Sequence, residues 1–233
     1  MLVTYRQFQT NVEAIKKRIE AACLRSNRPL DSVKILPVTK THPVDAVEYA
    51  HEFGFLAIGE NRVQEVAGKQ AQSTCPDAIE WELIGHLQSN KAKEAVQLFN
   101  RIQSVDSLKL ANRLNRFSEE LGKTLRVLIQ VNAGKDPAKF GFLPEATPGA
   151  FEALMALKNL EIEGLMTIAP LDDDLDTARR SFVELRDLRD SLEQQFGIAL
   201  PELSMGMTYD LEASVEAGST QVRIGTALFG PRD

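Results

Sequence analysis

The sequence predicts an α/β protein, a single-domain (β/α)8 TIM barrel with an extra N-terminal helix, over residues 1–233. Short apolar runs alternate eight times with amphipathic segments, and such alternation produces parallel strands whose crossover helices cover the sheet. No linker, internal repeat or low-complexity tract divides the chain. An open doubly wound sheet is the alternative, but none of the eight runs carries the charges or prolines that protect an edge strand.

The first half of the chain begins with a helix and continues with four pairs of strand and helix. Residues 3–24 are expected to form the helix because apolar residues recur there every three or four positions. Residues 33–40 are a β-branched run that predicts the first strand, and an Ala- and Glu-rich segment to residue 53 predicts its helix. The next pairs are expected at 55–59 and 61–72, at 79–85 and 89–99, and at 101–105 and 107–121.

The second half repeats this order and ends on a strand. Strands and helices are expected at 125–131 and 144–157, at 162–168 and 172–196, and at 202–205 and 210–217. An eighth strand is expected at 222–228, close to the end of the 233 residues, so no helix is expected after it. The N-terminal helix is expected to cover the face that this missing helix leaves open.

The composition argues against several kinds of partner. The 27 Lys and Arg residues against 33 Asp and Glu residues give a formal net charge of -6 without a dense basic block, which disfavours binding to nucleic acid or anionic membranes. Charged residues interrupt the apolar positions after Met1, so we expect no signal peptide, no membrane span and a cytoplasmic protein. The three histidines lack the spacing of metal ligands, so no metal site is expected.

Polar residues collect at the expected carboxyl ends of the strands, where TIM barrels form their active sites. Lys40 ends an otherwise apolar strand, and a lysine in a barrel mouth can become a neutral amine that forms a Schiff base with an aldehyde or ketone. A solvated lysine is the plainer alternative, and the position of Lys40 alone favours it. Small residues and hydroxyls that bind phosphate in many barrels follow strands seven and eight. They are Ser204, Gly206, Thr208, Gly225 and Thr226. A lysine facing a phosphate site predicts a phosphorylated aldehyde as the ligand.

Five blocks of sequence carry a family resemblance. They are TKT at 39–41, GEN at 59–61 with VQE at 63–65, WELIGHLQSNK at 81–91, SMGMT at 204–208 and RIGTALFG at 223–230. In this order they resemble the YggS/PROSC family of pyridoxal phosphate homeostasis proteins. The resemblance runs from roughly the first strand to the end of the chain.

The resemblance implies an alanine racemase-type barrel that binds pyridoxal 5'-phosphate (PLP) through a covalent aldimine on Lys40. It also implies that Arg223 faces the pyridine nitrogen, where a permanent positive charge disfavours ring protonation and weakens PLP as an electron sink. The other implied cofactor-binding residues are Ser204, Gly206, Thr208, Gly225 and Thr226 for the phosphate, Asn61 and His86 for the mouth, and Met166 and Met207 for the walls. Arg62 and Thr208 depart from the family pattern, which more often has tyrosine and serine there.

The implied function is that of a non-catalytic protein that buffers PLP inside the cell and passes it to apo-enzymes that need it. We expect a monomer. An amino-acid racemase is the alternative, but it needs a second acid or base opposite Lys40, for which Tyr209 is the one candidate. A Schiff-base aldolase for a sugar phosphate also fits a lysine beside a phosphate site, although such barrels usually carry the lysine on a later strand. Three other lysines lie in or near segments that resemble the family and are candidates to exchange the cofactor with Lys40. They are Lys91, Lys135 and Lys139.

Overall fold

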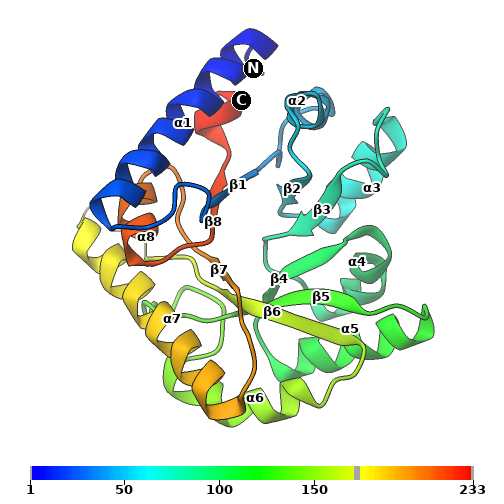
Figure 1. Cartoon of the computed structure of the whole chain (residues 1–233). Coiled ribbons are helices and arrows are strands. Elements are labelled where there is room, and N and C mark those ends of the chain that lie inside the picture. Colours follow the sequence, from blue (N-terminus) through cyan, green and yellow to red (C-terminus); the bar gives the residue numbers. More distant parts are fainter. Residues whose placement is uncertain (1, 171–173, 232–233) are drawn as a thin grey trace.

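Helix α1, Tyr5–Arg25, opens the fold along one side of a ring of strands (Figure 1). The computed structural model describes residues 2–170 and 174–231. Thr4 caps the helix by accepting a hydrogen bond from the backbone N–H of Gln7. The apolar face of α1 is buried, with Phe8 and Val12 fully covered. Residues 3–24 were predicted as this helix, and the prediction is confirmed within two residues.

The eight predicted strands are present and all pair in parallel. They are β1 Lys34–Pro37, β2 Ala57–Glu60, β3 Glu80–Leu83, β4 Arg101–Val105, β5 Leu125–Gln130, β6 Leu160–Met166, β7 Glu202–Ser204 and β8 Gln221–Ile224. They follow one another in the order β1-β8-β7-β6-β5-β4-β3-β2. An isolated parallel bridge between Val38 and Gly59 joins the ends of this order. The predicted (β/α)8 barrel is therefore confirmed, and the open sheet is not formed.

Helices pack around the outside of the ring (Figure 1). They are α2 Asp45–Phe53, α3 Val63–Gln72, α4 Ala92–Leu98, α5 Leu108–Glu120, α6 Thr147–Met155, α7 Leu175–Phe196, α8 Leu211–Ala217 and α9 Thr226–Phe229, with short 3-10 turns at Ser89–Lys91 and Pro144–Ala146. The helix predicted over 172–196 begins partly outside the described residues, which exclude 171–173. Within residues 2–170 and 174–231, no helix is both long enough and apolar enough to cross a bilayer.

The boundary predicted for the end of the eighth strand is wrong. Residues 222–228 were expected to form one strand, but β8 ends at Ile224 and the chain turns at Gly225 into the single-turn helix α9. A short apolar run does not distinguish a buried strand from a buried helix, which explains the error. A helix therefore does follow the eighth strand, and α1 packs against it: the ring of Phe8 stacks on that of Phe229 with centroids 5.0 Å apart, and the Asn11 amide donates to the Leu228 carbonyl at 2.9 Å.

Candidate functional site

The carboxyl ends of the strands surround a pocket of about 470 Å³. This volume lies in the range of about 300–1,000 Å³ that is typical of sites for small molecules. We call it the mouth pocket. Its walls are Val38, Lys40, Asn61, Ile84, Gly85, Ile168, Met207, Thr208, Tyr209, Arg223, Gly225, Thr226 and Ala227. It combines one amine, one guanidinium, several hydroxyl groups and an apolar lining.

Lys40 follows β1, and a buried ion pair holds the backbone beside it. The Lys69 ammonium donates to the Thr39 carbonyl at 2.7 Å and pairs with the Glu60 carboxylate, which also accepts the Thr39 hydroxyl at 2.5 Å. Glu60 is fully buried and Lys69 is 9% exposed. Burial raises the pKa of Glu60, while the charge of Lys69 opposes that rise. Side chains from β2 and α3 therefore hold the backbone next to Lys40 in place.

Arg223 projects from β8 and is held by neutral acceptors. Its Nη1 donates to the carbonyl and the hydroxyl of Ser204 at 2.7 and 2.8 Å, and its Nη2 donates to the Thr167 carbonyl at 2.8 Å. The residue is 4% exposed. Burial lowers the pKa of Arg223 to about 10, against the attraction of the Asp210 carboxylate. The guanidinium therefore stays charged at neutral pH and lines the mouth pocket as a cation without a direct carboxylate contact among its hydrogen bonds.

The turn after β7 has a backbone that requires glycine. Gly206 has a φ of +96°, and a Cβ atom there would lie 1.9 Å from the hydroxyl of Ser214. The Asp210 carboxylate accepts the Met207 backbone N–H at 2.6 Å and keeps the turn closed. This turn places Thr208 in the wall of the mouth pocket, with its backbone carbonyl bonded to Arg18 of α1 at 2.9 Å.

Substitution of Gly206 tests this turn. We expect Gly206→Ala to lower the free energy of unfolding by about 2–3 kcal/mol, because it combines left-handed backbone strain with overpacking against Ser214. Gly54→Ala is a matched control, since Gly54 has a φ of +97° but a Cβ atom added there would meet nothing within 4 Å. Urea unfolding of both variants measures the difference, and equal losses would contradict the role of the Ser214 contact.

Seven of the eleven residues predicted for the cofactor line the mouth pocket. They are Lys40, Asn61, Met207, Thr208, Arg223, Gly225 and Thr226. Met166 and Ser204 are fully buried in the strands beneath the pocket, and Gly206 shapes the turn above β7. The Ser204 hydroxyl accepts from Arg223 and donates to Gln103 at 2.6 Å, so it is engaged on both sides. The structure thus places Ser204 behind Arg223 instead of in the pocket wall.

His86 lies outside the mouth pocket, in a neighbouring hollow of about 280 Å³ that shares Asn61 with it. Its Nδ1 atom is 2.9 Å from a carboxylate oxygen of Asp106. Its ring stacks on Phe140, with centroids 3.7 Å apart and planes at 12°. The same hollow contains Arg62. His86 therefore does not line the mouth pocket with Lys40 and Arg223, and the two hollows meet at Asn61.

Several residues of the mouth pocket were missed in the sequence. Val38 stands two residues before Lys40, and side chains that are two apart on a strand share a face, so the alternation of the strand predicted over 33–40 was a usable signal. Gly85 was missed as a contact: a Cβ there would lie 2.4 Å from the Asn61 carbonyl oxygen, so the ends of β2 and β3 approach closely. Nothing in the sequence distinguishes Ile168 from other apolar residues.

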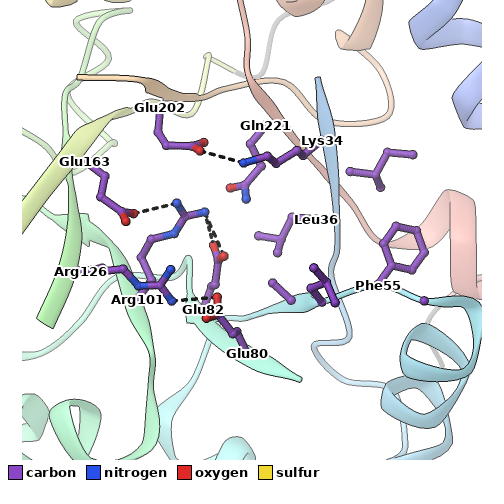
Figure 2. Close-up of a pocket in the computed structure, with 14 residues that line it drawn as sticks. Lys34, Leu36, Phe55, Glu80, Glu82, Arg101, Arg126, Glu163, Glu202 and Gln221 are labelled. Carbon is purple, nitrogen blue, oxygen red and sulfur yellow. Dashed lines mark hydrogen bonds and ion pairs between the residues drawn. The ribbon is translucent and has the colours of Figure 1, made fainter. Parts of the chain in front are cut away.

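The opposite end of the barrel holds a second pocket of about 480 Å³ (Figure 2). Its charged side chains are paired with one another. Arg101 contacts Glu82 twice at 2.9 Å and Glu163 at 3.0 Å, and further pairs join Arg126 with Glu80 at 2.8 Å and Lys34 with Glu202 at 3.3 Å. No pattern in the sequence indicates this cluster, because its members come from six different strands.

Comparison with known proteins gives relatives of nearly the same length. The chain matches the family described as alanine racemase, N-terminal domain, over residues 7–233. The pyridoxal phosphate homeostasis protein of Pasteurella multocida is 40% identical over 233 residues, which cover 97% of each chain. The protein of the same name from Mus musculus is 37% identical and covers 95% of this chain and 86% of its own length.

Solved structures agree with these relatives. PipY of Synechococcus elongatus PCC7942 with PLP bound superposes with a TM-score of 0.81 at 41% identity, covering 93% of this chain and 100% of PipY. Alanine racemase of Clostridium difficile superposes with a TM-score of 0.77 at 15% identity, covering 96% of this chain and 56% of the racemase. The second likeness concerns the fold alone.

Proposed function

Since this chain belongs to the family of pyridoxal phosphate homeostasis proteins, which is built on the alanine racemase N-terminal domain, we propose that it binds PLP in the mouth pocket. The proposed role is to hold PLP as a Schiff base on Lys40, to buffer it, and to deliver it to apo-enzymes that depend on it. We also propose that the protein does this as a monomer and without robust catalytic turnover.

One observation carries this proposal: an amine, a buried guanidinium and two threonine hydroxyls share the walls of one pocket. Lys40 supplies the amine and Arg223 the guanidinium. Thr208 and Thr226 come from the turns after β7 and β8 and supply the hydroxyls. PLP carries an aldehyde, a pyridine nitrogen and a phosphate, and each group has a chemical match in this set. When bound, PLP supplies the electrophilic aldehyde that the protein lacks.

Lys40 makes the covalent link in this proposal. Its neutral amine nitrogen forms a C=N bond with the aldehyde carbon, and the aldehyde oxygen leaves as water. Release is the reverse reaction with water, or transfer of the carbon to another amine with return of the Lys40 amine. The buried pair of Lys69 and Glu60 keeps the Lys40 backbone in place through the Thr39 carbonyl. No oxidant or further reactant is needed in either direction.

Phosphate contacts in this proposal come from the hydroxyls of Thr208 and Thr226 and from the backbone at Gly225, where α9 begins. The first N–H groups of a helix have no partner within it and can meet phosphate oxygens. Gly206 contributes through the shape of its turn. Ser204 contributes through Arg223, which it holds.

Arg223 favours a carrier over a catalyst. A charged guanidinium near the pyridine nitrogen opposes ring protonation, so the ring accepts little negative charge from a bond that breaks at the amino acid. Reactions that need a strongly delocalised carbanion are therefore disfavoured. The neutral acceptors around Arg223 leave its charge in place to act on the ring.

An absorption spectrum after PLP addition and removal of the excess tests the proposal. We expect a visible band from the Schiff base that borohydride bleaches, and a mass increase that maps to the peptide containing Lys40. Size-exclusion chromatography with light scattering tests the monomer, and transfer to an apo-enzyme that depends on PLP tests delivery. A protein that retains no PLP would overturn the proposed function.

The racemase remains the second candidate because Tyr209 lines the mouth pocket together with Lys40. A tyrosine on the far face of the cofactor is the second acid or base that racemisation needs. We expect purified protein loaded with PLP to interconvert L- and D-alanine no faster than free PLP does. Robust racemisation that is lost in Tyr209→Phe would establish the racemase instead.

A further inference from the structure

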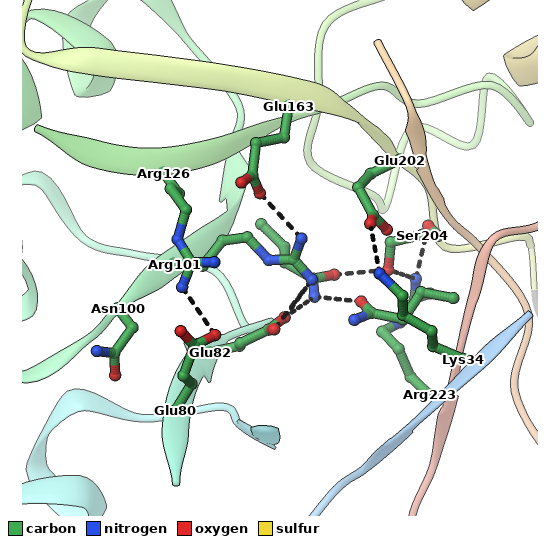
Figure 3. A network of polar contacts seen from close by, with 12 residues as sticks. Lys34, Glu80, Glu82, Asn100, Arg101, Arg126, Glu163, Glu202, Ser204 and Arg223 are labelled. Carbon is green, nitrogen blue, oxygen red and sulfur yellow. Dashed lines mark hydrogen bonds and ion pairs between the residues drawn. The ribbon is translucent and has the colours of Figure 1, made fainter. Parts of the chain in front are cut away.

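A column of buried polar side chains runs through the barrel interior from the second pocket to Arg223 (Figure 3). Arg101 and Gln103 stand two residues apart on β4 and share its inward face. Glu82 comes from β3 and Ser204 from β7. Gln103 and Ser204 are fully buried, and Glu82 is 2% exposed. The column joins the ion pair at one end of the barrel to the guanidinium at the other.

Each contact in the column fixes the direction of the next. Arg101 donates to both oxygens of Glu82, so this carboxylate can only accept, and it accepts the Gln103 amide N–H. The same amide nitrogen donates to Gln221 at 2.6 Å. A Gln103 side chain turned by 180° would place its oxygen against the carboxylate of Glu82. The charge of Glu82 therefore determines that the Gln103 oxygen points to Ser204.

The oxygen of Gln103 in turn determines the direction of the Ser204 hydroxyl. It accepts the Ser204 O–H at 2.6 Å. Because the single hydroxyl proton is used there, the lone pairs of the Ser204 oxygen are available to Arg223 Nη1, which donates to them at 2.8 Å. Without an acceptor at Gln103, the hydroxyl can rotate its proton toward the guanidinium.

Arg223 depends on this link more than an ordinary buried arginine does. Its hydrogen-bond acceptors are the carbonyl and hydroxyl oxygens of Ser204 and the carbonyl oxygen of Thr167, none of which carries a charge. Asp210 attracts it from a distance, since its effect on the pKa of Arg223 is purely electrostatic. The orientation of the guanidinium therefore rests on a few neutral hydrogen bonds.

We propose that Gln103 is a positioning residue for the cofactor: it directs the Ser204 hydroxyl oxygen to Arg223 and so fixes the guanidinium that faces the pyridine nitrogen. This inference rests on the proposed binding of PLP. Gln103 itself lies beneath the mouth pocket and does not line it. Its effect on PLP passes through Ser204 and Arg223.

Discrimination between two cofactors tests the proposal. The probes are PLP and N-methylpyridoxal 5'-phosphate, whose ring nitrogen carries a methyl group and a permanent positive charge. Wild type is expected to bind PLP more tightly than the methylated compound, because a fixed guanidinium repels it. In Gln103→Leu we expect the ratio of the two Kd values to fall about fivefold to tenfold, which corresponds to about one lost hydrogen bond.

Three variants separate positioning from loss of stability. Gln130→Leu is the matched control, since Gln130 is another buried barrel glutamine but donates to the Phe140 carbonyl at 2.9 Å, and its ratio is expected to equal that of wild type. Gln103→Glu keeps an oxygen that accepts from Ser204. Its carboxyl group, protonated beside Glu82, also donates to Glu82, so this variant is expected to keep the wild-type ratio of the two Kd values. Ser204→Ala removes the hydroxyl between Gln103 and Arg223, so it is expected to show the same fall in the Kd ratio as Gln103→Leu. It provides the test if Gln103→Leu does not fold.

A measurement without cofactor makes the two proposals independently testable. In protein labelled with 15N-arginine, we expect the guanidinium protons of Arg223, identified with Arg223→Lys, to exchange at least about fivefold faster in Gln103→Leu and Ser204→Ala than in wild type. Unchanged exchange together with an unchanged Kd ratio in both variants overturns the positioning role. If wild type binds neither cofactor, the proposed function fails, and the exchange rates alone decide whether Gln103 positions Arg223.

Discussion

Replacement of Lys40 by alanine is expected to abolish the visible band that forms on addition of PLP. The amine of Lys40 is the one lysine nitrogen in the walls of the mouth pocket as the structure describes it, and alanine has no nitrogen to form the C=N bond. The proposed contacts with the phosphate and the ring remain in this variant, so we expect PLP to bind without the covalent link. We expect the Kd for PLP to rise about a hundredfold or more, which corresponds to about 2.7 kcal/mol.

The controls for Lys40→Ala separate the nucleophile from charge and from other lysines. Lys40→Arg keeps a positive charge but provides no nucleophilic amine at neutral pH, so it is expected to lose the band as well. Lys91→Ala and Lys135→Ala alter partly exposed lysines that pair with Glu94 and Glu145, and both variants are expected to keep the band. A band of unchanged intensity in Lys40→Ala would place the covalent link on another lysine.

Replacement of Lys69 by methionine is expected to give the largest loss of stability. Methionine removes the cation that pairs with Glu60, and among the described residues it leaves this fully buried carboxylate with a hydrogen bond from the Thr39 hydroxyl. Breaking a buried ion pair in this way costs about 3–5 kcal/mol. The double variant Glu60→Leu with Lys69→Met removes both charges and is expected to recover most of this loss. Urea unfolding at pH 7.5 measures both.

The loss in Lys69→Met is expected to depend on pH. Burial raises the pKa of Glu60 above its ordinary value, and removal of Lys69 leaves that rise unopposed. A carboxyl group with a higher pKa in the folded state binds protons preferentially when folded, so stability increases as the pH falls from the folded pKa toward the unfolded value of about 4.5. The deficit relative to wild type should therefore be smaller at pH 5 than at pH 7.5.

An exposed ion pair provides the comparison for Lys69. Lys91→Met removes the pair with Glu94, whose side chain is 38% exposed, and is expected to cost at most about 1 kcal/mol at either pH. The PLP band of Lys69→Met is expected to form more slowly, because the Thr39 carbonyl beside Lys40 loses its donor. Equal stability losses in Lys69→Met and Lys91→Met would show that the Lys69 and Glu60 pair does not support the strand end.

The order of strands and helices was predictable because it depends on local patterns. Each strand is a short apolar run and each helix has the spacing of an amphipathic helix. Counting these segments favoured a barrel over an open sheet, and the closure itself depends on long-range pairing of β1 with β8 and on the bridge from Val38 to Gly59. An exception was the end of the strand predicted over 222–228, where Ala227 and Leu228 are apolar enough for a strand but lie in the helix α9 against α1. Long-range contacts with α1, such as Phe8 with Phe229 and Asn11 with Leu228, accompany the helix, and a local apolar pattern does not contain them.

The candidate site was predictable in part for a similar reason. Lys40 stands out as a cation at the end of an apolar run, and the family resemblance implies a role for Arg223; the structure brings both to the mouth pocket. Ser204 also occupies a predicted position at the end of a strand, but whether its hydroxyl faces the pocket or the barrel interior depends on Gln103 of another strand. Pairings between strands that are far apart in the sequence leave no trace in a single chain.

The pairing of the first strand with the last has a consequence for the synthesis of the protein. β1 pairs with β8 along its whole length, and α1 reaches Glu212 through Arg18, across 194 residues. A ribosome produces Lys40 long before Arg223, Gly225 and Thr226, which lie more than 180 residues further along the chain. Contacts of such long range form late in folding. A nascent chain therefore carries the amine long before it has the rest of the pocket, and the ring can close only after β8 has left the ribosome.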